Sequence, residues 1–199
     1  MPSLVRDGVV MPILHVSQLA SALELPLPEA KESTRLAWDT ASILEGWLEH
    51  LRLADWTLLT SPTPSRGRTL RNLTVNVFHP FELLPRAWET VWFDWDPDQD
   101  DEREAALTTV EEIRTYAESI LHGWQGFLLE AEGLLADRDP LVASPRGEVT
   151  YSNLLASQRW HAAFHYRQLT AYLRGKGVAL PHPFIVESLA DLELPGEIF

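Results

Sequence analysis

The chain has 199 residues, a length typical of a single domain. It is 45% hydrophobic and contains 8 Trp, 7 Phe and 4 Tyr, which is enough apolar material for a core and excludes wholesale disorder. Acidic residues outnumber basic ones 29 to 16, for a net charge of −13. Because binding to nucleic acid or to an anionic membrane relies on Lys and Arg, this charge argues against both partners.

The composition also limits the chemistry of any site. With no cysteine, the chain has no disulfide, no thiolate nucleophile and no thiolate metal ligand, so any thiol must come from a cofactor or substrate. No apolar run approaches the roughly 18–20 residues that span a bilayer. Residues 1–7 lack the basic region of a signal peptide, so we expect a cytoplasmic protein.

Prolines interrupt the apolar N-terminal stretch, which predicts an irregular arm over residues 1–28 with a short helix near Ser17–Leu23. From Glu29 apolar residues recur at helical spacing and predict a helix over Glu29–Leu53. A proline-rich loop follows at Thr60–Gly67.

A second helix is predicted from Thr69, as N-cap, to about Trp92. Pro80 and Pro85 fall inside it, and each removes a backbone donor, so we expect a kink. Near Pro80 the carbonyl left without its helical partner belongs to Asn76.

The acidic stretch Asp94–Glu102 is predicted to be a loop. Its residues Asp94, Asp96 and Asp98 match the first three ligand positions of an EF-hand, but Ala105 stands where the final Glu is needed. We therefore interpret it as a solvated loop without a calcium site.

A third helix is predicted from the capping-box patterns at Thr108 and Thr109 to about Glu132, ending at Gly133. Gly123 and Gly126 inside it are typical of close helix contact. Thr150 or Ser152 begins a fourth helix that continues to Arg174 and ends at Gly175.

Four long helices predict an all-α, up-down four-helix bundle over residues 29–199, with a C-terminal tail from Val178. No segment alternates strongly enough to require a sheet.

The fourth helix carries a pair of histidines, His161 and His165, four residues apart and therefore on one face. This spacing allows both to reach one metal ion, but a third ligand from a facing helix is needed. The four other histidines outside the second helix (His15, His50, His122 and His182) are interpreted as surface or packing residues.

Three segments resemble DinB-like proteins. RTLRNLTVNVF, residues 68–78, resembles their second helix. The segment from YSNLL to QRWHAAFHYRQL, residues 151–169, resembles their fourth helix, and LELPGEIF, residues 192–199, resembles their tail.

The resemblance implies a four-helix bundle that forms a homodimer. It also implies a divalent metal (Zn, Ni, Mn or Fe) held by one histidine of the second helix and the H-x-x-x-H pair of the fourth. In that family the metal activates a low-molecular-weight thiol. The expected function is a metal-dependent, thiol-using transferase or isomerase that acts on a small electrophile.

The chain departs from the family at the second helix, where Asn76 stands in place of the first metal histidine. Three alternatives are open: Asn76 is a ligand through its side-chain oxygen, His79 takes its place, or the metal site is lost. In the third case the chain is a non-catalytic bundle that binds an apolar small molecule or a protein partner. The group that faces His161 and His165 discriminates between these alternatives.

Overall fold

The computed structural model describes residues 3–6, 9–12, 33–64, 67–96, 99–181 and 192–196. It is mostly helical, which confirms the all-α prediction. Among the described residues, no helix combines the length and apolar character that a membrane span needs. The short helix expected near Ser17–Leu23, together with His15 and His182, lies outside the described residues.

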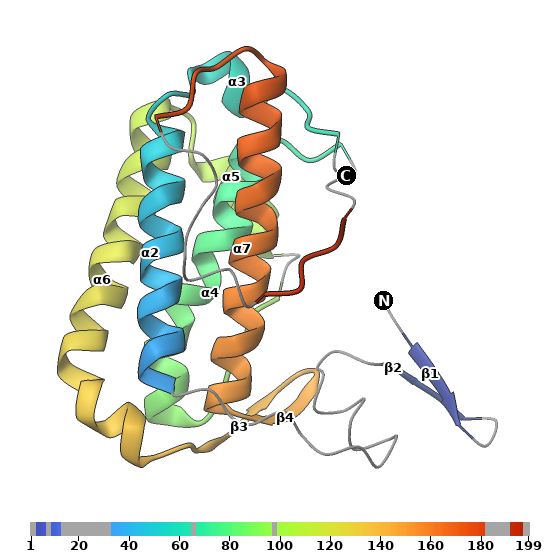
Figure 1. The fold of residues 1–199 in the computed structure, drawn as a ribbon, viewed down its shortest axis with the longest axis vertical. Coiled ribbons are helices and arrows are strands. Elements are labelled where there is room, and N and C mark those ends of the chain that lie inside the picture. Colours follow the sequence, from blue (N-terminus) through green and yellow to red (C-terminus); the bar gives the residue numbers. More distant parts are fainter. Residues whose placement is uncertain are drawn as a thin grey trace.

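Four long helices lie side by side along the long axis of the molecule (Figure 1). They are α2 (Ser33–Leu51), α4 (Leu70–Thr90), α6 (Val110–Asp137) and α7 (Tyr151–Gly175). Helix α2 packs on α6 and α7, and α4 packs on the same two helices from the other side. The core between them includes Trp47 and Trp124, both fully buried.

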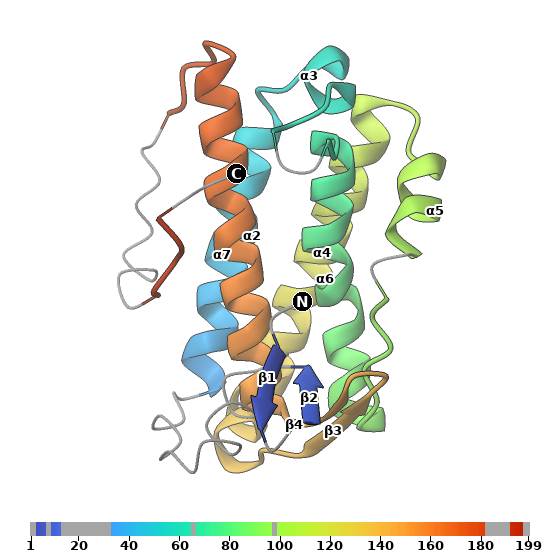
Figure 2. The same cartoon turned by 90° about the vertical axis from the view of Figure 1, so that its right-hand side faces the viewer.

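The helices do not alternate strictly in direction. Helices α2 and α7 run one way while α4 and α6 run the other, so the chain between α4 and α6 returns along the bundle (Figure 1). That return contains a short helix, α5 (Gln99–Ala106), which lies beside α4 (Figure 2). The alternation expected from the sequence is therefore absent between α4 and α6.

The predicted helix starts are confirmed by their caps. Thr69 and Thr150 each accept a hydrogen bond from the backbone N–H three residues on. Thr109 and Glu112 form a complete capping box at the start of α6. Helix α4 continues through Pro80 and Pro85 to its end.

Several predicted boundaries and loops were wrong. The acidic stretch contains α5, because acidic residues in a first turn favour the positive end of the helix dipole. Helix α6 continues past Gly133 to Asp137. A short helix that was not predicted, α3 (Trp56–Thr60), is capped by Asp55.

Two hairpins are present where no strand was expected. One pairs β1 (Ser3–Arg6) with β2 (Val9–Pro12). The other pairs β3 (Leu141–Ser144) with β4 (Gly147–Thr150) and joins α6 to α7. Four-residue strands are too short to give a period-two signal.

The glycine that permits a close approach is not one of the two predicted in α6. A Cβ on Gly123 or Gly126 would meet nothing within 4 Å. A Cβ on Gly46 of α2 would lie 2.7 Å from the hydroxyl of Tyr166 on α7.

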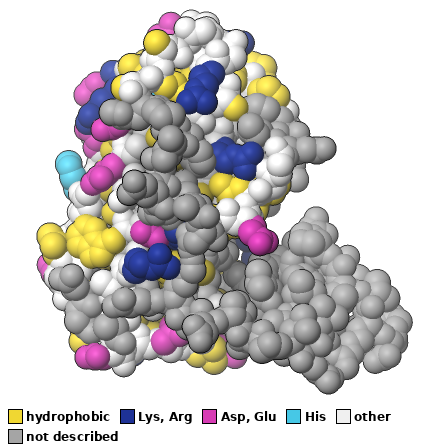
Figure 3. Space-filling view, viewed as in Figure 1, with side chains coloured by type: hydrophobic (Ala, Val, Ile, Leu, Met, Phe, Trp, Pro, Cys, Tyr) yellow, Lys and Arg dark blue, Asp and Glu magenta, His cyan; other side chains and the backbone are white. Residues whose placement is uncertain are grey.

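On the face seen in Figure 3, acidic and basic side chains are interspersed over the described residues.

A candidate metal centre beside an aromatic pocket

The structure brings His161 together with both of its predicted neighbours. Its Nε2 atom lies 3.1 Å from Oδ1 of Asn76 on α4. Its ring also meets the ring of His165, one turn further along α7, with centroids 4.7 Å apart and planes nearly perpendicular at 85°. The side chain that faces His161 from α4 is thus a polar amide and not an apolar group.

A buried carboxylate fixes the orientation of that amide. Asn76 donates from Nδ2 to Oδ2 of Asp100 at 2.7 Å, so its Oδ1 must be the atom that faces His161. An amide oxygen only accepts, and His161 therefore donates from Nε2–H. In the neutral ring the lone pair is then on Nδ1.

His79, the other predicted third ligand, interacts with the same carboxylate. Its Nδ1 lies 2.8 Å from Oδ1 of Asp100, and both side chains are about 1–2% exposed. No described contact joins His79 to His161. The placement therefore favours Asn76 over His79 as the group that completes a site with the histidine pair.

Helix α5 lies beside α4 (Figure 2), and its acidic side chains contact polar side chains of α4. Asn72 donates to Asp101 and Glu104, and Arg71 lies 2.9 Å from Glu104. Sequence reasoning missed Asp100 because the stretch was interpreted as a solvated loop. In the sequence, the polar residues Arg71, Asn72 and Asn76 of α4 were the signal for such a carboxylate, because polar side chains that become buried need polar partners.

His165 is oriented by a residue of its own helix. Its Nδ1 lies 2.6 Å from Oε1 of Gln168, which is buried. With Nδ1–H donated to that oxygen, Nε2 carries the lone pair of the neutral ring. A histidine that ligates a metal is usually held in this way through its other nitrogen.

Burial is the main cause that lowers the pKa of His161 well below 6.5, and the neighbouring His165, Arg68 and Arg146 add to it. At neutral pH the ring is therefore uncharged. A neutral imidazole is the form that accepts a hydrogen bond or binds a metal.

One pair of donors, Asn76 Oδ1 and His161 Nε2, has a spacing that suits a shared divalent ion. The 3.1 Å between Asn76 Oδ1 and His161 Nε2 matches the roughly 3.0–3.4 Å expected for two ligands each about 2.0–2.2 Å from one ion. Within the described ranges, no three His, Asp or Glu side chains are grouped to hold a metal. A site at this position therefore depends on the amide oxygen as its third donor.

A pocket of about 260 Å³ opens next to His161. Its walls come from the segment after α4, the β3–β4 hairpin and α7. Two backbone hydrogen bonds fix the segment after α4 against β3. Phe93 donates its N–H to the carbonyl of Ala143, and Ala143 donates its N–H to the carbonyl of Val91. Val91 ends α4 with a positive φ of 51°, which turns the chain toward β3.

Three residues that line this pocket have buried polar atoms without partners. They are Nε1 of Trp95, Oε1 of Gln158 and Nδ1 of His161, and none of them has a hydrogen bond to the described part of the chain. Buried polar atoms are normally paired, so three orphans lining one pocket indicate a place for a ligand or water. Arg146, exposed at the hairpin turn, lies over the Trp95 ring at 5.3 Å.

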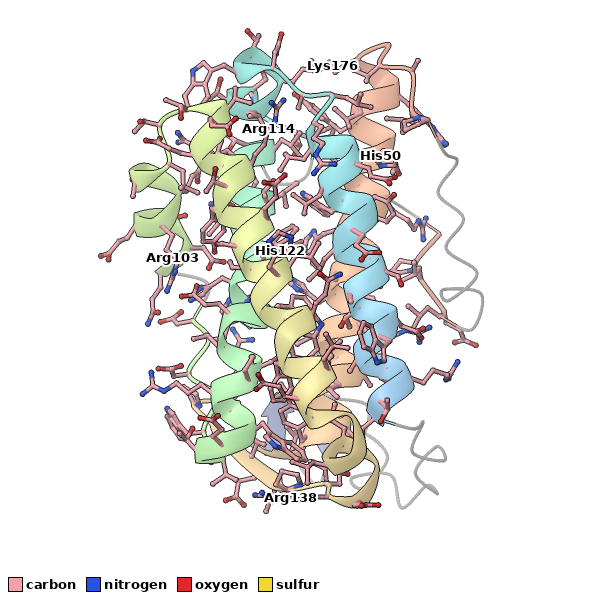
Figure 4. The ribbon with its side chains drawn as sticks, turned by 90° about the vertical axis from the view of Figure 1, so that its left-hand side faces the viewer. His50, Arg103, Arg114, His122, Arg138 and Lys176 are labelled. Carbon is pink, nitrogen blue, oxygen red and sulfur yellow. The ribbon has the colours of Figure 1, made fainter. Side chains whose placement is uncertain are left out.

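The remaining singled-out residues have structural roles. His50 is buried and stacks on Tyr166, while His122 is exposed on α6 (Figure 4). Arg167 donates to the carbonyl of Pro195 in the described part of the tail.

Comparison of the chain with family models, with characterised proteins and with solved structures gave no significant match. The function must therefore be inferred from the geometry of the site.

Proposed function

We propose that this chain is a DinB-like four-helix bundle that holds a divalent metal at Asn76, His161 and His165. In this proposal it is a transferase or isomerase that joins a low-molecular-weight thiol to a small electrophile. The observation that carries the proposal is the contact of Asn76 Oδ1 with His161 Nε2, with the amide held in that orientation by Asp100.

Asp100 and the pocket lining set the charge and the polarity around the proposed ion. Three neutral donors leave the charge of an ion uncompensated, and the Asp100 carboxylate behind Asn76 partly offsets it. When bound, a divalent ion would supply the Lewis acidity that lowers the pKa of a thiol. The adjacent pocket offers an apolar surface to the electrophile beside His161.

Metal content of the purified, tag-free protein tests the first half of the proposal. Wild type is dialysed against Zn, Ni, Mn or Fe(II) and then analysed by elemental mass spectrometry. We expect near-stoichiometric metal that disappears in His161→Ala, while His122→Ala, which changes an exposed histidine of α6, retains it. Asn76→His replaces the amide with an imidazole and should tighten binding.

Two outcomes would redirect the assignment. Retention of metal in Asn76→Ala would move the third-ligand role to His79. Absence of metal from wild type after reloading would overturn the metal proposal. The thiol half is tested separately, by the metal-dependent consumption of a small thiol in the presence of 1-chloro-2,4-dinitrobenzene.

A second candidate function follows from the pocket. We infer that, if the histidine pair holds no metal, the chain is a non-catalytic bundle that binds a small molecule. The supporting observation is that His161 already has a hydrogen-bonded partner in Asn76, while three residues that line the pocket have buried polar atoms without a described partner.

We also propose that the chain forms a homodimer, and light scattering in solution tests this.

A further inference from the structure

The pocket beside His161 has a chemistry of its own that indicates its ligand. The apolar lining includes Phe93, Val142, Val149 and Leu154. The rings of Phe93 and Trp95 lie 6.5 Å apart, so two aromatic side chains line it close together. Its volume of about 260 Å³ is below the roughly 300–1,000 Å³ of sites for drug-sized molecules, which favours a ligand with a single ring.

One arginine lines this pocket in a strongly acidic chain. The guanidinium of Arg146 forms no ion pair within the part of the chain that the structure describes. An arginine without a carboxylate partner beside an apolar pocket favours an anionic ligand group, carboxylate above all.

The inner end of the pocket has a different requirement. Oε1 of Gln158, a residue only 4% exposed, can only accept, and Nδ1 of His161 also accepts because Nε2–H is donated to Asn76. Two unpartnered acceptors need a donor from the ligand, such as a hydroxyl group. The indole Nε1–H of Trp95 offers a donor to the ligand in return.

We propose that this pocket binds a small aromatic carboxylic acid that carries a hydroxyl group. The ring packs against Phe93 and Trp95, the carboxylate meets Arg146 near the solvent, and the hydroxyl reaches Gln158 and His161 inside. The inference rests on the pocket that both proposed functions use, and it is stated for the metal-free protein, in which His161 donates Nε2–H to Asn76.

Titration calorimetry with EDTA-treated protein tests this assignment. The probe is 4-hydroxybenzoate, compared with 4-hydroxybenzyl alcohol, which lacks the anion, and with benzoate, which lacks the hydroxyl. We expect Arg146→Gln to weaken 4-hydroxybenzoate about tenfold, equivalent to about 1.4 kcal/mol, and to leave the alcohol unchanged. Arg138→Gln is the matched control, because Arg138 also lies over a tryptophan, Trp88 at 5.1 Å, but does not line the pocket.

A second variant separates the two ends of the ligand. Gln158→Leu should reduce the advantage of 4-hydroxybenzoate over benzoate severalfold while Arg146→Gln leaves that ratio unchanged. In ¹⁵N-labelled protein the indole resonance of Trp95, assigned with Trp95→Phe, should shift on binding.

The assignment is overturned if none of the three probes binds at millimolar concentration, or if Arg146→Gln and Arg138→Gln have equal effects. Because these measurements use metal-free protein, their failure leaves the metal proposal unaffected. Loss of metal binding, in turn, leaves this pocket intact.

Discussion

The buried Asp100 carboxylate supplies the sharpest test of the site, because it accepts from two donors on α4. It is 1% exposed and lies 2.7 Å from Nδ2 of Asn76 and 2.8 Å from Nδ1 of His79. Asp100→Ala leaves both donors buried and unpaired. At about 1–3 kcal/mol for each, the free energy of unfolding should fall by about 2–6 kcal/mol.

Two companion variants make this prediction specific. Asp101→Ala is the control in the same turn of α5, because Asp101 is exposed and accepts only one described hydrogen bond, of 3.1 Å, from Asn72. This variant should change the free energy of unfolding by less than about 0.5 kcal/mol. Asp100→Asn can keep both hydrogen bonds if His79 changes tautomer, and it should lose only about 1 kcal/mol per bond, the charge-assisted part. Urea denaturation measures all three.

The tautomer of His161 provides a second measurement on the same variants. In metal-free wild type the ¹⁵N shifts of the ring should show a protonated Nε2 and a lone pair on Nδ1. In Asp100→Ala the Asn76 amide is free to rotate, and the tautomers of His161 should become mixed. An equal loss of stability in Asp100→Ala and Asp101→Ala, together with an unchanged His161 tautomer, would refute the proposed orientation of Asn76.

Three further predictions concern the scaffold. Asp39→Ala removes the carboxylate that lies 2.9 Å from the guanidinium of Arg159, a side chain only 1% exposed, and urea denaturation should show a loss of about 3–5 kcal/mol. A loss below about 1 kcal/mol would contradict the importance of this buried ion pair. Gly46→Ala places a Cβ 2.7 Å from the Tyr166 hydroxyl and should lower stability by about 1–3 kcal/mol in thermal melts, but by clearly less in a Tyr166→Phe background. Hydrogen bonds from Thr108 and Thr109 lower the pKa of Glu112 below its ordinary 4.5. The ionised carboxylate therefore stabilises the fold above pH 4.5, and this stabilisation is lost as the pH falls through the pKa of the folded state. The gap in Tm between wild type and Glu112→Gln should therefore narrow below pH 4.5, and a gap independent of pH would show that these hydrogen bonds do not favour the ionised carboxylate.

Helix positions and caps were predictable because they depend on local interactions. The start of α4 follows from Thr69 and its bond to the N–H three residues later, and the start of α6 from the reciprocal bonds of Thr109 and Glu112. The histidine pair of α7 is likewise a matter of spacing along one helix. The sequence therefore determined where α4, α6 and α7 start and that His161 and His165 share one face of α7.

Only the tertiary structure decided what those residues meet. Asn76 lies 24 residues from Asp100 and 85 from His161 along the chain, and it meets both because α5 and α7 pack on α4 from different sides. The pocket likewise needs three separate segments, one of them a hairpin whose strands are too short to leave a pattern. A carboxylate that looks solvated in the sequence becomes a buried acceptor once its helix docks, since burial depends on the packing of distant elements and not on local residue type.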